Sequence, residues 1–426
     1  MSTGAAGPLA GVRVVEFGAF IAGPFAGQML ADMGADVVKV EPPFGDPWRH
    51  HMSFAPGESR VFLSLNRGKR SVCLDLKKPE AINACHRLIA QSDAVISNNR
   101  PDTAKLLKID YPSLSAVNPA LVYCEITAYG PKGPEADRPG FDLVMQGYSG
   151  VMATEGKMDR GHPGPVRSSS FIDFSTAYAA VNSVLAGLIE RGRTGKGQCI
   201  TTSLLANALA MQTMPLVNVD RAPSAAQRWL AESIPGLRER GASFEEIQQG
   251  YQPAAMSPLY RAYYRAYKTL DGAFALGTLA VPARLRLLEM LGLADPRLTD
   301  PGYDATTPEA VAAGDRLVEA MEAAFGGMTT AESLRDLGEC DIPCEPVQFI
   351  EDMVENEQAL ANGYIVELEH PVGGRYRSSG PVSHFASGNP VPMPSPTLGQ
   401  HTAAVLEELG YTAEAIAELI DSGCAR

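Results

Sequence analysis

The stretch VRVVEFGAFIAGPFAGQMLADMGADVVKVE (residues 12–41) predicts how the chain begins to fold. Val12–Phe17 is rich in β-branched and aromatic residues and predicts a strand, and Gly23-Pro24 follows with a proline where a helix can begin. Apolar residues then recur at helical spacing: Phe25, Met29, Leu30 and Met33. Gly34 ends this helix, and Asp36–Val40 predicts the next strand. A strand–helix–strand opening favours a parallel sheet covered by helices.

The same alternation continues over about the first half of the chain. Further strands are predicted at Ser71–Leu74, Ala94–Ser97, Leu121–Thr127 and Gln198–Leu204. Further helices are predicted at Pro79–Gln91, Asp102–Lys108 and Tyr178–Arg191. The pattern indicates an α/β fold. The first turn, GAFIAGP, is not Gly-x-Gly-x-x-Gly and therefore gives only a weak indication of dinucleotide binding.

The composition and the predicted secondary structure change near residue 215. Residues 222–253 are polar and helical in character, which suggests a linker into a second unit. Asp271-Gly272 then separates two β-rich runs and predicts a hairpin. Helices are expected at about 281–291, 307–325 and 329–338, and a last amphipathic stretch runs from His401 to Ile420.

Composition limits the class of protein. A chain of 426 residues with 45% hydrophobic content can bury a large core and suggests two domains. It has no apolar run of 18 residues and no signal-peptide pattern, so we expect a cytoplasmic protein without a membrane span. A net charge of −13 disfavours non-specific binding to nucleic acid or to a membrane surface. Of the seven cysteines only Cys340 and Cys344 are close together, which is a poor zinc signal, and we predict no metal site.

One aspartate stands out within SSSFIDFST (residues 168–176). Asp173 is flanked by apolar residues just ahead of the predicted helix Tyr178–Arg191. A carboxylate at such a strand-to-helix junction can be partly desolvated near free helix N–H groups, which suits a nucleophile that attacks a thioester. An aspartate there is also a common N-cap, the reading that the local sequence favours, and the two roles are compatible.

Ten short patterns occur in a characteristic order along the chain. They are Leu9–Glu16, Ala22–Pro24, Gly34–Glu41, Gly45–Pro47, Asn66–Ser71, Asn99–Pro101, Gly140–Asp142, Asp173, Thr194–Gln198 and Leu398–Thr402. Together they closely resemble the family III CoA-transferases, also called the CaiB/BaiF family. The resemblance covers nearly the whole chain and is densest over residues 9–205.

The resemblance implies a particular domain organisation. Members have a large Rossmann-like domain built from both ends of the chain, which here corresponds to residues 1–210 and 360–426. A smaller α+β domain would span residues 231–345, with linkers at 211–230 and 346–359. The resemblance also implies an interlocked homodimer, in which each chain threads through the other.

The resemblance places the family nucleophile on Asp173. In members that transfer CoA, this carboxylate attacks the donor acyl-CoA, passes through a mixed anhydride and an aspartyl-CoA thioester, and an acceptor acid reverses the sequence. The partners implied are an acyl-CoA and a small carboxylic acid. CoA is a substrate, and no permanently bound cofactor is implied. A closed site would be needed to keep water from the anhydride.

The resemblance also suggests residues that contact CoA. They are Ile21, Ala22, Leu74, Asp75, Leu76, Lys77, Asn98, Asn99, Arg100, Lys105, Arg138, Phe141 and Asp142. The four cations of this set are plausible partners of the phosphates, although each alone is an ordinary surface charge. Trp48 and His50 could line the acyl pocket, or could belong to an ordinary surface loop.

Two other functions remain open from the sequence. The same family contains α-methylacyl-CoA racemases, which move a proton with a histidine and an aspartate. Their histidine falls at Phe141, which cannot carry a proton, so a transferase is favoured over an isomerase. A non-catalytic or dinucleotide-binding protein that kept only the fold is the third possibility.

Overall fold

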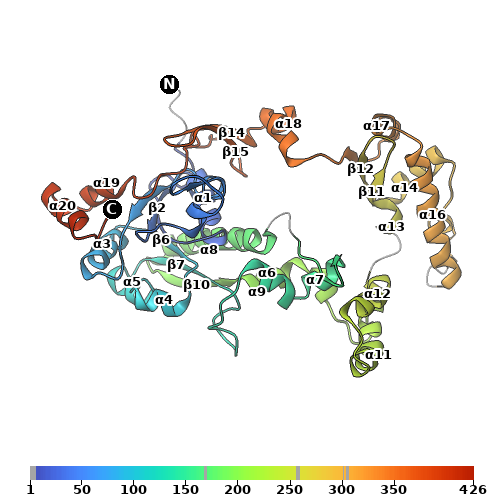
Figure 1. Cartoon of the computed structure of the whole chain (residues 1–426), viewed down its shortest axis with the longest axis horizontal. Helices are drawn as coiled ribbons and strands as arrows, with labels where there is room; N and C mark the ends of the chain where they lie inside the picture. Colours follow the sequence, from blue (N-terminus) through green and yellow to red (C-terminus); the bar gives the residue numbers. More distant parts are fainter. Residues whose placement is uncertain (1–5, 167–169, 256–259, 301, 304–306) are drawn as a thin grey trace. The chain divides into compact units, whose positions relative to one another are not determined.

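The computed structural model describes residues 6–166, 170–255, 260–300, 302–303 and 307–426 (Figure 1). The chain forms two compact units. Unit 1 contains residues 1–159, 163–217 and 354–426, and unit 2 contains residues 160–162 and 218–353. The predicted linker 211–230 contains the end of one helix, a short helix α10 (Thr213–Leu216) and the start of α11 (Ala225–Glu239).

Unit 1 is built on one parallel sheet, as the sequence predicts. Its six strands lie in the order β10-β7-β6-β1-β2-β5, and every neighbouring pair is parallel. Their bounds are β1 Arg13–Phe17, β2 Asp36–Glu41, β5 Arg70–Cys73, β6 Ala94–Ser97, β7 Val122–Thr127 and β10 Gln198–Ser203. The chain starts in the middle at β1, builds outward through β2 and β5, and then returns to build the other side from β6. The strand order therefore reverses between β1 and β6.

Successive residues of each strand pack on opposite faces of this sheet. Val15, Val38 and Val95 belong to one buried cluster, whereas Val14, Val37 and Ala94 belong to the other. Helices α3 (Pro79–Ala90), α19 (Thr402–Glu408) and α20 (Ala413–Asp421) supply the first cluster. Helices α1 (Ala22–Asp32) and α8 (Phe171–Thr194) supply the second. The sheet is thus covered on both faces, as a parallel sheet requires.

The end of the chain completes this core. The amphipathic stretch from His401 folds as two helices, α19 and α20, because Gly410 between them has a φ of 82°, in the left-handed region. Before them, β14 (Ile365–His370) and β15 (Gly374–Ser379) form a hairpin. The remaining elements of this unit are η1 Pro47–His50, β3 Ser53–Ala55, β4 Glu58–Ser59, α2 Arg60–Leu65, α4 Pro101–Leu106, α5 Tyr111–Val117, α6 Asp142–Tyr148, α7 Val151–Glu155, β8 Met158–Asp159, α9 Leu204–Met211 and α18 Glu357–Ala361, and β9 His162–Pro163 crosses the unit boundary.

Unit 2 contains the predicted hairpin. Strands β11 (Tyr264–Lys268) and β12 (Ala273–Gly277) pair antiparallel around Asp271-Gly272, and β13 (Cys344–Pro346) pairs with β12. Tyr267, Phe274 and Phe325 pack ring against ring in its core. Its other elements are α12 Phe244–Ala255, α13 Tyr260–Tyr263, α14 Val281–Leu291, α15 Pro296–Thr299, α16 Pro308–Gly326, α17 Thr330–Glu339 and, ending across the unit boundary, η2 Ile350–Glu355.

Helix α8 departs from the sequence prediction. It begins at Phe171, not near Tyr178, so Asp173 lies inside its first turn and not at a junction ahead of it. Among the described residues, α8 is the one helix with the length and composition of a possible membrane span. Its side chains Ala177, Val181 and Val184 are buried in the core with α1, as expected of a core helix in a folded domain.

Candidate functional site

A cavity of about 320 Å³ opens at the carboxyl ends of the parallel strands of unit 1. Its lining comes from the loops after β1, β6 and β7, together with residues 136–141, Asp173 and Leu204. The strand order reverses between β1 and β6, and ligands of open α/β sheets bind in the crevice at such a switch point. Topology thus identifies this cavity as the candidate site.

Asp173 lies in the wall of this cavity. It occupies the third position of α8 and is half-buried. Burial, and then the nearby charge of Asp142, raise the pKa of its carboxyl group to about 7. A carboxylate with this pKa is more basic than an exposed one, and about half of it is ionised at neutral pH, which suits a nucleophile.

Asp142 caps helix α8 from outside that helix. Its carboxylate Oδ2 accepts hydrogen bonds from the backbone N–H groups of Ile172 at 2.9 Å and of Asp173 at 3.2 Å. Ser170, the N-cap residue itself, makes no side-chain cap. The interpretation of Asp173 as the N-cap is therefore wrong, because a buried carboxylate from α6 takes the helix N–H groups and leaves the Asp173 side chain facing the cavity.

Aromatic rings form one wall of the cavity. The rings of Phe20 and Phe141 meet edge to face at 5.2 Å, and the ring of Trp48 also meets Phe20 edge to face, at 5.5 Å. Phe20 and Phe141 line the cavity, and Trp48 contacts Phe20 without belonging to the lining. Phe141 thus contributes apolar surface beside Asp173, at the position where a racemase would need a base.

Seven of the predicted site residues line this cavity: Ala22, Asn98, Asn99, Arg100, Arg138, Phe141 and Asp173. The side-chain amides of the two asparagines hold the loop after β1. Asn98 accepts from the N–H of Ala19 and donates to its C=O, and Asn99 donates to the C=O of Phe17. Arg100 and Arg138 are exposed, and each pairs with a nearby carboxylate.

The other predicted residues lie outside the cavity lining. Leu74 is buried in the core after β5, Asp75 and Leu76 are half-buried, and Lys77 is exposed. Lys105 is exposed in the last turn of α4, and half-buried Ile21 is the N-cap residue of α1. The exposed ring of His50 bonds the carbonyl oxygen of Phe44 at 2.6 Å, in the turn beside Trp48.

Sequence reasoning missed Phe20. This residue has a φ of 64°, in the left-handed region that non-glycine residues rarely adopt, and its ring connects Trp48 with Phe141. Its position directly before Ile21 and Ala22 was the available signal. Among the residues that the structure describes, no group of three or more His, Cys, Asp or Glu is arranged to hold a metal ion.

Comparison with known proteins identifies the family. The model of CoA-transferase family III matches residues 9–402. The chain belongs to this family. As a family III CoA-transferase it contains the motifs that the sequence suggested, and the resemblance stated from those motifs is confirmed.

Curated relatives of this CoA-transferase cover nearly its whole length. The mouse succinyl-CoA:glutarate CoA-transferase is 32% identical over 98% of this chain and 90% of its own. The succinate–glutarate CoA-transferase of Agrobacterium fabrum is 34% identical over 94% of this chain and 96% of its own. A CaiB/BaiF family protein from Brucella suis, of known crystal structure, is 29% identical with a TM-score of 0.72 over 95% of this chain and 100% of its own. These matches confirm the α/β fold with a six-stranded parallel sheet.

Proposed function

We propose that this CoA-transferase moves CoA from an acyl-CoA donor to a carboxylic acid acceptor, with Asp173 as the nucleophile. The observation that carries the proposal is the half-buried Asp173 carboxylate in the wall of the cavity, with a pKa of about 7. Among the residues that the structure describes around this cavity there is no histidine, so the chemistry that they offer beside Asp173 is that of a carboxylate and not of an imidazole base.

The first half of the reaction loads CoA onto the protein. A carboxylate oxygen of Asp173 attacks the thioester carbonyl carbon, the C–S bond breaks, and CoA leaves as the thiolate, so a mixed anhydride forms. The thiolate then attacks the Asp173 carbonyl carbon of the anhydride. The donor acid leaves as its carboxylate, and an aspartyl-CoA thioester remains.

The second half runs the same steps in reverse. The acceptor carboxylate attacks the aspartyl thioester, releases the thiolate and forms a second anhydride. The thiolate attacks the acceptor carbonyl carbon, giving the new acyl-CoA and freeing the Asp173 carboxylate. One anion enters and one leaves at each step, so no net proton transfer is required and the activation of the thioester is conserved.

The cavity walls suit an anhydride. Phe20, Phe141 and Leu204 present apolar side chains around Asp173, and such surface disfavours ordered water near an activated bond. The exposed cations Arg100 and Arg138 lie at the cavity, where they can meet CoA phosphates once their partner carboxylates are displaced. Leu74–Lys77 and Lys105 remain proposed contacts outside the lining.

The names of the curated relatives suggest the class of acid. The mouse protein is named for succinyl-CoA and glutarate, and the Agrobacterium protein for succinate and glutarate. Succinate and glutarate are short dicarboxylic acids. We propose a carboxylic acid of small size for this chain. A panel of acyl-CoA donors crossed with mono- and dicarboxylic acceptors, analysed by mass spectrometry for new thioesters, would identify the donor and the acceptor.

The covalent intermediate gives the direct test. Incubation with an active acyl-CoA should add a CoA-sized mass to the peptide that contains Asp173. Asp173→Ala should remove both the adduct and the exchange of labelled CoA, a loss of many orders of magnitude. Asp137→Ala, at an exposed carboxylate that lines the same cavity, is the matched control and should keep both. Exchange that survives Asp173→Ala would refute the assignment.

A further inference from the structure

Several family motifs meet in a buried cluster of ionic side chains beneath the first loop of unit 1. Glu16, Lys39, Asp46 and Lys69 are at most 3% exposed. They come from β1, from β2, from the turn after β2 and from the residue before β5. Burying charges carries a large desolvation cost unless each charge is paired, so the arrangement of this ionic cluster requires a physical explanation.

Lys39 is at the centre of the ionic cluster. Its ammonium nitrogen lies 2.8 Å from Glu16 Oε1 and 3.0 Å from Asp46 Oδ2, and it donates to the carbonyl oxygen of Gly18 at 2.7 Å. The contacts with Glu16 and Gly18 are hydrogen bonds, and the contact with Asp46 is an ion pair. Burial alone lowers the pKa of Lys39, but the Glu16 and Asp46 carboxylates outweigh this and raise it above the ordinary value. Lys39 is therefore held as a cation in the core.

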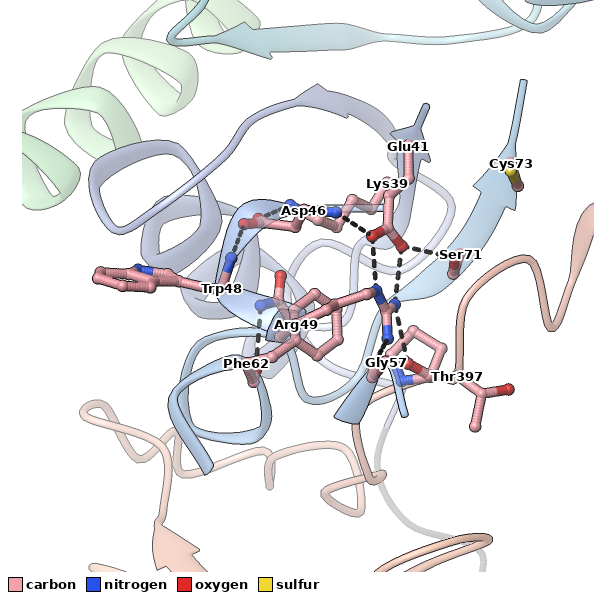
Figure 2. Close-up of polar contacts among 12 residues, drawn as sticks. Lys39, Glu41, Asp46, Trp48, Arg49, Gly57, Phe62, Ser71, Cys73 and Thr397 are labelled. Carbon is pink, nitrogen blue, oxygen red and sulfur yellow. Dashed lines mark hydrogen bonds and ion pairs between the residues drawn. The ribbon is translucent and has the colours of Figure 1, made fainter. Parts of the chain in front are cut away.

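Asp46 connects Lys39 with Phe20 in the aromatic wall and with Trp48. Its Oδ1 accepts the backbone N–H of Trp48 at 2.9 Å and that of Phe20 at 3.4 Å (Figure 2 shows Lys39, Asp46 and Trp48). Its own backbone N–H donates to the carboxylate of Glu41, which also pairs with Arg49 (Figure 2). The Asp46 carboxylate thus fixes the backbone of Phe20 and of Trp48, whose rings pack together.

The turn Gly18–Phe20 is held from several sides. Lys39 holds the carbonyl of Gly18, Asn98 bonds both polar groups of the Ala19 backbone, and Asp46 accepts from Phe20. A left-handed φ at a bulky residue is unfavourable and persists only when the surroundings enforce it. The hydrogen bonds of this turn supply that enforcement for Phe20, which has a φ of 64°.

We propose that the Lys39–Asp46 ion pair positions the Gly18–Phe20 turn, and so places the Phe20 ring against Phe141 in the wall of the Asp173 cavity. The pair touches neither substrate nor the reacting atoms and acts through the loop. The inference rests on the proposed function where it concerns rate. The placement of the ring stands on geometry alone.

Lys69 provides a matched control within the same ionic cluster. Its ammonium group is as deeply buried and pairs with the other oxygen of Glu16 at 2.7 Å. Its remaining contacts are the carbonyl oxygen of Pro24 and the side chain of Asn66, and none is with the Gly18–Phe20 turn. If the ionic cluster served only general stability, loss of either lysine would have the same consequences.

Tryptophan fluorescence tests the placement without any enzymatic assay. The chain has two tryptophans, Trp48 and Trp229, so Trp229→Phe leaves Trp48 as the single reporter. In this background Lys39→Met should increase the quenching of Trp48 by acrylamide and shift its emission, because Asp46 loses its fixed partner. Lys69→Met should leave both signals unchanged, even if it lowers the melting temperature.

The rate of covalent loading tests the consequence. With saturating acyl-CoA, Lys39→Met should slow formation of the Asp173 adduct by about 10- to 100-fold, the effect expected of a misplacement near 1 Å. Lys69→Met should load at the unmodified rate. If the unmodified protein forms no adduct, the proposed function fails, while the fluorescence comparison still decides the positioning role.

A second variant covers the case in which Lys39→Met does not fold. Asp46→Ala removes the acceptor of both the Phe20 and the Trp48 N–H groups and leaves Lys39 with Glu16 and the Gly18 carbonyl. It should reproduce the increased quenching and the slower loading. Equal effects of Lys39→Met and Lys69→Met, or unchanged quenching in a folded Lys39 or Asp46 variant, would overturn the proposal.

Discussion

Two carboxylates meet at the first turn of α8: Asp173 belongs to this turn, and Asp142 accepts hydrogen bonds from its backbone. Their surroundings differ. Asp142 is 6% exposed, and its oxygens accept from two backbone N–H groups and from the Gln146 amide. Asp173 is half-buried and faces the cavity, with a raised pKa. The oxygens of buried Asp142 hold the start of α8, and its charge helps to raise the pKa of Asp173. This difference supports the proposal that Asp173 is the reactive member of the pair.

The pH dependence of loading follows from this pair. In the proposed mechanism the nucleophile is the ionised form of Asp173, so we expect the rate of adduct formation to fall as pH drops below about 7, the raised pKa of that group. Asp142→Asn keeps an acceptor for the helix but removes the charge. It should move this acidic limb to lower pH, although burial, the larger cause, keeps part of the shift.

Stopped reactions analysed by mass spectrometry across pH 5–9 would measure both profiles. Asp137→Asn is the control, because this carboxylate also lines the cavity but does not contribute to the shift of Asp173. Superimposable profiles for the unmodified protein and Asp142→Asn would contradict the electrostatic account.

At the scale of elements, helix α8 must pack closely on the sheet to bring its first turn to the cavity. Gly187 is a point of close approach. A Cβ there would lie 2.5 Å from Val122 Cγ1 and 2.9 Å from Ile200 Cδ1, both on strands beneath the helix. The absence of a side chain therefore sets the distance between α8 and the β7–β10 edge.

Substitution of two glycines in this helix should give opposite effects. Gly187→Ala should destabilise unit 1 by about 1–3 kcal/mol, the usual cost of overpacking. Gly192→Ala, in the same helix with nothing within 4 Å of its added Cβ, should be neutral or stabilising by up to about 1 kcal/mol because alanine favours the helix. Urea unfolding followed by circular dichroism measures both values, and a neutral Gly187→Ala would show that the helix can move away without cost.

At the scale of the whole molecule, the structure leaves apolar side chains exposed that a single chain does not cover. Met211, Met214, Leu216, Val217 and Val219 follow one another near the end of α9 and in the segment after it, each at least 50% exposed. A contiguous exposed apolar segment of this kind is typical of an interface. We propose that it is covered in a homodimer, of the interlocked kind implied by the family.

Light scattering on the purified protein should therefore give a mass near twice the 45.3 kDa of one chain. Interlocked chains cannot separate without partial unfolding, so dilution to nanomolar concentration should not yield monomer within hours. Met214→Lys and Leu216→Lys together should lower the yield of dimer, whereas Leu106→Lys, at an equally exposed apolar residue elsewhere, should not. A monomer at micromolar concentration would contradict the proposal.

The elements that could be predicted are those set by local periodicity. Ala94–Ser97 and helix 281–291 have the predicted bounds, and the turn Asp271-Gly272 joins the expected strands. The start of α8 could not be found, because serines and aromatic residues are weak helix formers and the capping carboxylate comes from Asp142, about 30 residues earlier. From the sequence alone, the side chains of Lys39 and Lys69 would be expected at the surface, as lysines usually are. Their burial could not be predicted, because only the fold brings their acidic partner Glu16 beside them.

The sequence by itself determined the strand–helix alternation, the parallel sheet and the family, and it singled out Asp173 as the candidate, because hydrophobic period and ordered motifs are local properties of the chain. The tertiary structure alone decided that Asp142 caps α8, that Phe20 completes the aromatic wall and that buried Lys39 connects to Phe20 through Asp46. These contacts join segments that are far apart in sequence. Their energies depend on burial and distance, which no local pattern of residues encodes.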